Sequence, residues 1–299
     1  MSQTNYGGNN TQVNTGLYNT NIFNPEPDTP IVGIPHNLLR RSDTFVGRDA
    51  ELIQIKEQLQ QGDRLAITAI AGMGGIGKTE LALQYAYHHL EQETYEGGIC
   101  WLRARESEVG SQLVSFARIN LKLKVPEEGD LTEQIRFCWQ HWRSGTALII
   151  LDDVTDYALI QDYLPPSEPR FQVLITTRLQ LGSAVRPLEL GVLSEAAALE
   201  LLRSLTMAER IDRQLPAAEQ LCEWLGYLPL GLELVGRYLE REPDLSLTEM
   251  LSRLNQEKLR QTALVREEAD PTWASKAQYG VAAAFELSWR ELDPAAQYL

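Results

Sequence analysis

The sequence has little that would place the protein outside the cell or in a membrane. Its 299 residues include three cysteines, Cys100, Cys138 and Cys222, which are far apart and lack metal-ligand spacing. Such cysteines are typical of reduced thiols in a protein core, so we expect a cytoplasmic protein. No basic segment followed by an apolar run opens the sequence, and no apolar run approaches the roughly 18 residues that span a bilayer.

Positive charge is also scarce. The chain carries 27 Lys and Arg against 41 Asp and Glu, which gives a formal net charge of −14. A surface that binds nucleic acid or an anionic membrane needs a dominant positive field, so we expect neither as a partner. The composition, 43% hydrophobic and 23% charged, is typical of a globular protein, and the length allows two domains.

The N-terminal segment has few residues that could form a core. Its first thirty residues are rich in Asn, Thr and Gly and contain no lysine or arginine. We therefore predict that residues 1–44 are a disordered tail followed by a proline-rich linker. Aromatic residues such as Tyr6 and Tyr18 leave a second interpretation open, a tail that binds a partner protein.

A glycine-rich loop lies between an apolar strand and an apolar-periodic helix. Residues 72–79 read GMGGIGKT and match the phosphate-binding pattern GxxxxGK[ST]. Glycines adopt backbone angles closed to other residues, so successive amide N–H groups can surround a phosphate at the N-terminus of the helix. Lys78 would reach the terminal phosphates, and the Thr79 hydroxyl would ligate Mg²⁺. The loop residues expected to bind the ligand are Gly72, Gly74, Gly75, Ile76, Gly77, Lys78, Thr79 and Glu80.

The order of apolar patterns predicts an α/β fold. Residues 147–151 and 171–177 are apolar runs that suit parallel strands buried on both faces, and strands alternate with helices up to residue 190. From residue 194 helical patterns follow one another without strands, and this pattern is still running at Leu299. We predict a phosphate-binding sheet domain at residues 45–191, a helical domain at 192–279, and the start of a further domain at 280–299.

Charged side chains follow two of the apolar strands. Asp152 directly follows the apolar strand 147–151, at the position where a protein with a phosphate-binding loop needs a negative charge to hold Mg²⁺. Asp153, the next residue, could orient or deprotonate an attacking water. An aspartate reaches less far than a glutamate, which indicates slow turnover. Arg178 could contact a γ-phosphate. The alternatives are that the two acids cap a turn, that Arg178 is solvated, and that Pro229 is a structural first residue of a helix.

With these pieces in place, the sequence resembles the NB-ARC subclass of STAND ATPases, the nucleotide switch of plant disease-resistance proteins, apoptosome ATPases and many bacterial regulators. Five motifs occur in the order of that family. They are FVGR at 45–48, GMGGIGKT at 72–79, LIILDDV at 148–154, ITTR at 175–178 and GYLPL at 226–230. Residues 285–294, FELSWRELDP, resemble the start of the family's winged-helix domain.

The resemblance implies an adenine nucleotide, ATP or ADP with Mg²⁺, held between the sheet domain and the helical domain. It implies that the family's ATP form opens and assembles into homo-oligomers, with protein partners bound through regions outside this chain. Glu80 stands where plant members have threonine, which suggests a bacterial member. The residues that the resemblance assigns are Val46 and Arg48 beside the adenine, Pro229 and Leu230 on the nucleotide, Asp152 with Thr79 at Mg²⁺, and Arg178 as the γ-phosphate sensor.

Three functions remain open on the sequence. The first is a signalling switch with slow ATP hydrolysis, carried out with Lys78, Asp153 and Arg178. The second is a scaffold that keeps ADP as a structural ligand and does not hydrolyse ATP. The third is a transcriptional regulator with an NB-ARC switch, which the acidic charge disfavours for this part of the protein.

Overall fold

The computed structural model describes residues 33–61, 64–69, 74–105, 108–179, 181, 185–264, 280–286 and 289. Side chains at 69 and 258–264 are not described. The predicted tail up to residue 32 and most of the predicted winged-helix segment lie outside these ranges. The predictions for both segments therefore stay predictions.

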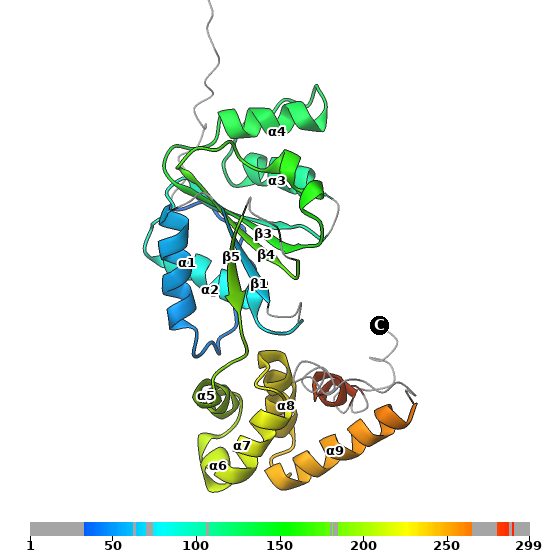
Figure 1. Cartoon of the computed structure of the whole chain (residues 1–299). Helices are drawn as coiled ribbons and strands as arrows, with labels where there is room; N and C mark the ends of the chain where they lie inside the picture. The colour runs from blue at the N-terminus through cyan, green and yellow to red at the C-terminus, as the bar shows by residue number, and fades with distance from the viewer. Residues whose placement is uncertain are drawn as a thin grey trace, which may run out of the picture.

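A parallel five-stranded sheet organises the first part of the chain (Figure 1). Its strands run in the order β2-β3-β4-β1-β5, and every pairing is parallel. All carboxyl ends therefore meet at one edge, as the α/β prediction required. The strands are β1 (Arg64–Ala69), β2 (Gly98–Arg103), β3 (Ala147–Val154), β4 (Phe171–Thr177) and β5 (Arg186–Leu190).

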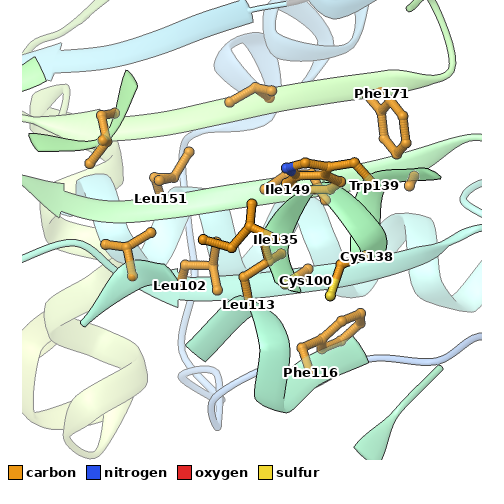
Figure 2. Close-up of a cluster of buried hydrophobic side chains, with 14 of the residues drawn as sticks. Cys100, Leu102, Leu113, Phe116, Ile135, Cys138, Trp139, Ile149, Leu151 and Phe171 are labelled. Atoms are coloured by element: carbon orange, nitrogen blue, oxygen red, sulfur yellow. The ribbon is translucent and has the colours of Figure 1, made fainter. Parts of the chain in front are cut away.

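Helices cover both faces of the sheet. Helices α1 (Asp49–Gln61) and α2 (Lys78–Glu91) pack on one face. Helices α3 (Val109–Ile119) and α4 (Leu131–Gln140) pack on the other, where Figure 2 shows their side chains meeting those of β2 and β3.

Strand β3 shows why its sequence is a continuous apolar run. Ile149 and Leu151 point to the core beneath α3 and α4, whereas Leu148 and Ile150 belong to the core beneath α1 and α2. A strand buried on both faces has no polar side to alternate with. The three cysteines are free and buried, as predicted from their spacing.

A separate layer of helices follows the sheet (Figure 1). Ser194 caps the first of them, because its Oγ accepts the Ala197 N–H at 3.2 Å. These helices share a core of their own. Their bounds are α5 (Glu195–Leu205), α6 (Ala208–Arg213), α7 (Leu215–Trp224), α8 (Pro229–Arg241) and α9 (Leu247–Leu264).

Residues 33–44, here called the N-terminal strap, run along the sheet edge and helix α2. The Pro35 carbonyl accepts the Ile99 N–H at 2.9 Å. Asn37 pairs twice with Trp101, through Oδ1 to the backbone N–H at 2.7 Å and through Nδ2 to the carbonyl at 2.8 Å. The strap thus satisfies polar groups that edge strand β2 would otherwise leave unpaired. The sequence placed these residues in the linker.

Candidate functional site

The phosphate-binding pattern lies between β1 and α2. Gly75 and Gly77 have positive φ values of 77° and 95°, which residues with a side chain rarely adopt. Gly77 is the N-cap of α2 and offers no side-chain cap, so the first N–H groups of this 14-residue helix are available to an anion. Ile76 is buried and anchors the loop in the core. Gly72 lies outside the described residues.

Lys78 is the first residue of helix α2 and lies near the positively charged Arg178 and the negatively charged Asp152 and Asp153. Burial is the main cause that lowers its pKa, and the neighbouring Arg178 lowers it further. Asp153 and Asp152 oppose this shift. Lys78 and Arg178 therefore repel each other across the site, and a polyanion between them would relieve that repulsion.

The acid Asp152 is joined to two threonines. The Thr79 hydroxyl donates to Asp152 Oδ1 at 2.8 Å, and the buried Thr176 hydroxyl donates to the same oxygen at 2.5 Å. The Thr79 hydroxyl and the Asp152 carboxylate thus lie together, and hard oxygen ligands of this kind suit Mg²⁺. Within the described ranges, no group of three or more His, Cys, Asp or Glu side chains could hold a metal.

Asp153 has an unusual backbone. Its φ is 57°, and the pairing of β3 with β4 shifts register between Leu151 and Val154. The sequence predicted that the strand would end before the acids. Instead it continues through them with this irregularity, which changes the direction of Asp153. The Asp153 N–H donates to Thr176 Oγ1 at 2.8 Å, so Thr176 holds both acids.

Arg178 follows the end of β4 and lies against the loop. Its guanidinium carbon would be 3.7 Å from a Cβ built on Gly74. An added Cβ would be in ordinary van der Waals contact with the guanidinium, so Arg178 lies directly against the loop. This is the end of the sheet where Arg178 was expected.

The helical layer contacts the phosphate loop directly. Pro229 is the first residue of α8, and the next N–H, that of Leu230, donates to the Gly75 carbonyl at 3.2 Å. A Cβ on Gly75 would lie 2.9 Å from Leu230 Cβ, and one on Gly77 would lie 3.9 Å from Pro229 Cγ. Gly75 therefore allows α8 to approach the loop, whereas a Cβ on Gly77 would meet Pro229 at an ordinary contact distance.

The FVGR motif forms another wall of the site. Arg48 is buried, and its guanidinium binds Glu51 Oε1 at 2.7 Å and the Gly191 carbonyl at 2.6 Å. Arg48 thus joins α1 to the segment between the sheet and the helical layer. Val46 is half-buried against the core of that layer.

Glu80 binds the strap. Its Oε1 accepts the Ser42 N–H at 2.9 Å and Gln84 Nε2 at 2.8 Å, while Gln84 Nε2 also donates to the Ser42 carbonyl at 3.0 Å. Both backbone groups of Ser42 are therefore held by α2. These contacts of Glu80 hold the strap residue Ser42, which lines the cavity, beside the phosphate loop.

These elements enclose one cavity of about 390 Å³ between the sheet and the helical layer. It brings together all predicted site residues except Gly72 and Asp152, the latter being bound to the lining residue Thr79. Thr176 also lines it and was missed from the sequence. The predicted residues in the lining are Val46, Arg48, Gly74, Gly75, Ile76, Gly77, Lys78, Thr79, Glu80, Asp153, Arg178, Pro229 and Leu230.

A phosphate loop opening a helix at the carboxyl edge of a parallel sheet defines a P-loop NTPase. More particularly, the chain belongs to the NB-ARC domain family, whose sequence profile matches residues 48–212, more than half of its length. Nucleotide binding is expected for this family.

The chain is similar to two groups of curated proteins. Regulatory protein AfsR of Streptomyces griseus is 28% identical over 260 residues, which are 84% of this chain and 25% of that protein. Disease resistance protein RPP8 of Arabidopsis thaliana is 30% identical over 142 residues, which are 45% of this chain and 15% of that protein. The chain thus spans about a quarter or less of the length of these relatives.

Among solved structures, the chain is similar to the Walker-type ATPase PABY2304 of Pyrococcus abyssi. The TM-score is 0.50 at 13% identity, and the match covers 76% of this chain and 77% of the other. At that identity the likeness shows the fold alone. Over the described part of the chain, no helix is long and apolar enough to cross a membrane.

Proposed function

We propose that the chain is a STAND-type signalling switch that binds ATP or ADP with Mg²⁺ in the cavity between the sheet and the helical layer. One observation carries the proposal. The cavity is lined both by the phosphate loop and by the start of α8, and the Leu230 N–H donates to the Gly75 carbonyl. A ligand there would contact both parts, so a change at its phosphates could alter how they pack.

In this proposal Lys78, Arg178 and the N-terminus of α2 bind the phosphates. Thr79 and Asp152 hold Mg²⁺, which when bound neutralises charge on the phosphates. Val46, Arg48 and the strap residue Ser42 border the base or sugar, and Pro229 covers it. Supporting this division, the cations and Asp153 lie at the sheet edge while the apolar walls come from the FVGR motif and the helical layer.

ATP hydrolysis by this chain would be slow and would control its conformation. ADP would stabilise the closed arrangement of sheet and helices, and ATP would favour an open form that assembles into homo-oligomers. A nucleotide can shift such an equilibrium only by its differential affinity for the two forms. Cytoplasmic localisation belongs to the same proposal, because all three cysteines are free and buried.

A second candidate is a transcriptional regulator that contains this switch, since relatives are named regulatory protein AfsR. The net charge of −14 disfavours direct DNA contact by this part of the protein. A salt-sensitive shift of duplex DNA by the chain would favour that candidate. A third, an ADP-bound scaffold without hydrolysis, would show bound ADP and no phosphate release.

The proposal is tested by removing the phosphate-binding amine. Lys78→Ala should weaken ATP and ADP binding at least about tenfold, because charge-assisted contacts to phosphate are the strong ones. Isothermal titration of each nucleotide with Mg²⁺ measures this. Lys56→Ala is the matched control, since Lys56 is an exposed lysine of α1 outside the cavity lining. Equal nucleotide affinity of wild type and Lys78→Ala would overturn the assignment of the phosphate site.

A further inference from the structure

The chain following β2 brings an arginine to the two acids of β3. Arg103 is in register with Asp152, and the Ala104 N–H donates to the Asp152 carbonyl at 2.8 Å. The pairing of the strands thus continues one residue past β2 and carries Arg105 to the edge of the cavity. Arg105 Nε binds Asp153 Oδ2 at 2.9 Å.

The pair is asymmetric in its surroundings. The Arg105 side chain is 63% exposed and is absent from the cavity lining, whereas the Asp153 side chain is 31% exposed and lines the cavity with Lys78 and Arg178. Arg105 therefore reaches Asp153 from outside the site. The backbone of Asp153 is fixed separately, through its N–H to Thr176.

We propose that Arg105 is a positioning residue that restrains Asp153 and thereby slows ATP hydrolysis. The inference rests on the proposed function, in which Asp153 acts on the attacking water. In that reaction the water oxygen bonds to the γ-phosphorus, the bond from that phosphorus to the bridging oxygen breaks, and a water proton passes to the Asp153 carboxylate. ADP and inorganic phosphate result.

The ion pair opposes this role of Asp153 directly. A carboxylate that accepts a proton must present an oxygen lone pair to the water, and the Arg105 N–H occupies one lone pair of Oδ2 and so restrains the orientation of the carboxylate. Because the Asp153 backbone is held by Thr176, the carboxylate cannot change its orientation within the cavity without leaving Arg105. A solvent-exposed pair of this kind is weak, so its release should change the rate only about two- to fivefold.

The test compares wild type, Arg105→Gln, Asp153→Asn and the double variant, with Arg136→Gln as control. Arg136 is an exposed arginine of α4, so its replacement removes the same charge away from Asp153. For each protein, kcat and KM for ATP hydrolysis and the Kd for ATP are measured. We expect Arg105→Gln to raise kcat about two- to fivefold with KM and Kd unchanged. Asp153→Asn should lower kcat, and adding Arg105→Gln to it should change nothing further.

Two further readouts separate restraint from a purely structural role. Salt screens exposed ion pairs, so raising the ionic strength should increase kcat of wild type more than that of Arg105→Gln. Arg105→Lys retains a cation that can reach the carboxylate and should keep kcat near the wild-type value.

The inference is overturned if Arg105→Gln hydrolyses ATP no faster than wild type, or if its effect persists beside Asp153→Asn. A weaker Kd in Arg105→Gln would also overturn it, because Arg105 would then bind the phosphates. These results leave the proposed function intact when wild type binds and hydrolyses ATP. If no variant consumes ATP, both the inference and the proposed hydrolysis fail, and the Kd then decides whether nucleotide binding survives.

Discussion

At the scale of single residues, Thr176 shows how one hydroxyl can organise two acids. It donates to the Asp152 carboxylate and accepts the Asp153 N–H, although it comes from a different strand. The buried Thr176 hydroxyl therefore has a hydrogen-bond partner both as donor and as acceptor. Asp152 and Asp153 are adjacent in the sequence, but only Asp152 is bonded to the Mg²⁺-ligand candidate Thr79.

His89 in helix α2 makes the stability of the fold depend on pH. The residue is buried between Tyr85 and Tyr95, with ring centroids 4.4 and 5.6 Å away, and its Nδ1 is 2.9 Å from Thr94 Oγ1. Burial lowers its pKa to about 4, and the nearby side chains of His88 and Lys56 add to that shift. The unfolded chain therefore binds this proton at a higher pH than the folded chain, near the ordinary value of 6.5.

We expect the free energy of unfolding to fall as the pH drops from 6.5 towards 4, because the unfolded state gains a proton there. Urea titrations at several pH values measure this decrease. His89→Gln should show a smaller decrease over the same window, whereas His36→Gln, at an exposed position that takes no part in this shift, should behave like wild type. An equal pH dependence in wild type and His89→Gln would contradict this account.

The site residues that the sequence could predict are those grouped in short motifs. The residues 74–79 follow from the spacing of one loop, because a phosphate cradle is built from consecutive backbone groups. Thr176 lies inside the ITTR motif, but the motif does not show that it contacts the two acids, and Arg105 and Ser42 lie outside the five motifs. Each acts through a contact with a residue far away in the chain, and a threonine in a strand or an arginine after one is an ordinary residue until its partner is known.

At the scale of elements, the FVGR motif and helix α5 meet at a position that only glycine fits. Gly47 has a φ of 68°, and a Cβ built on it would lie 2.2 Å from the Ala197 Cβ of α5. This contact, beside the Arg48 bond to Gly191, joins the start of the sheet domain to the helical layer.

Gly47→Ala should destabilise the chain by about 2–5 kcal/mol, from backbone strain at positive φ together with overpacking against α5. Urea unfolding measures the loss. Gly33→Ala is the matched control, since Gly33 has a φ of 83° with nothing within 4 Å of its added Cβ. The control should show the strain alone, about 1–2 kcal/mol. Equal losses in both variants would mean that α5 does not press on Gly47.

The elements themselves were largely predictable. Strands buried on both faces are marked by continuous apolar runs, and the capped helix α5 by Ser194. Helix α6 is an exception, because its six residues are too few for a periodic pattern and only Ile211 among them is buried. Helix α4 ends at Gln140, and Trp142 beyond it packs against Phe116 and Trp139.

At the scale of the whole molecule, an acidic protein places basic side chains in a cavity that acidic side chains also line. The formal net charge is −14, yet Lys78 and Arg178 face the same space as the N-terminus of α2. The negative net charge gives the protein surface no general attraction for anions. Selective binding of a polyanion therefore depends on the local charges of this cavity. The strap, the loop and α8 all contribute to its wall, so a bound nucleotide would connect three separate parts of the chain.

The most direct test of this account is to denature the protein as purified and identify the released nucleotide by chromatography. We expect ADP or ATP at near one molecule per chain in wild type, and little or none in Lys78→Ala. A wild-type protein that releases no adenine nucleotide, and that binds neither ATP nor ADP when these are added with Mg²⁺, would contradict the central claim.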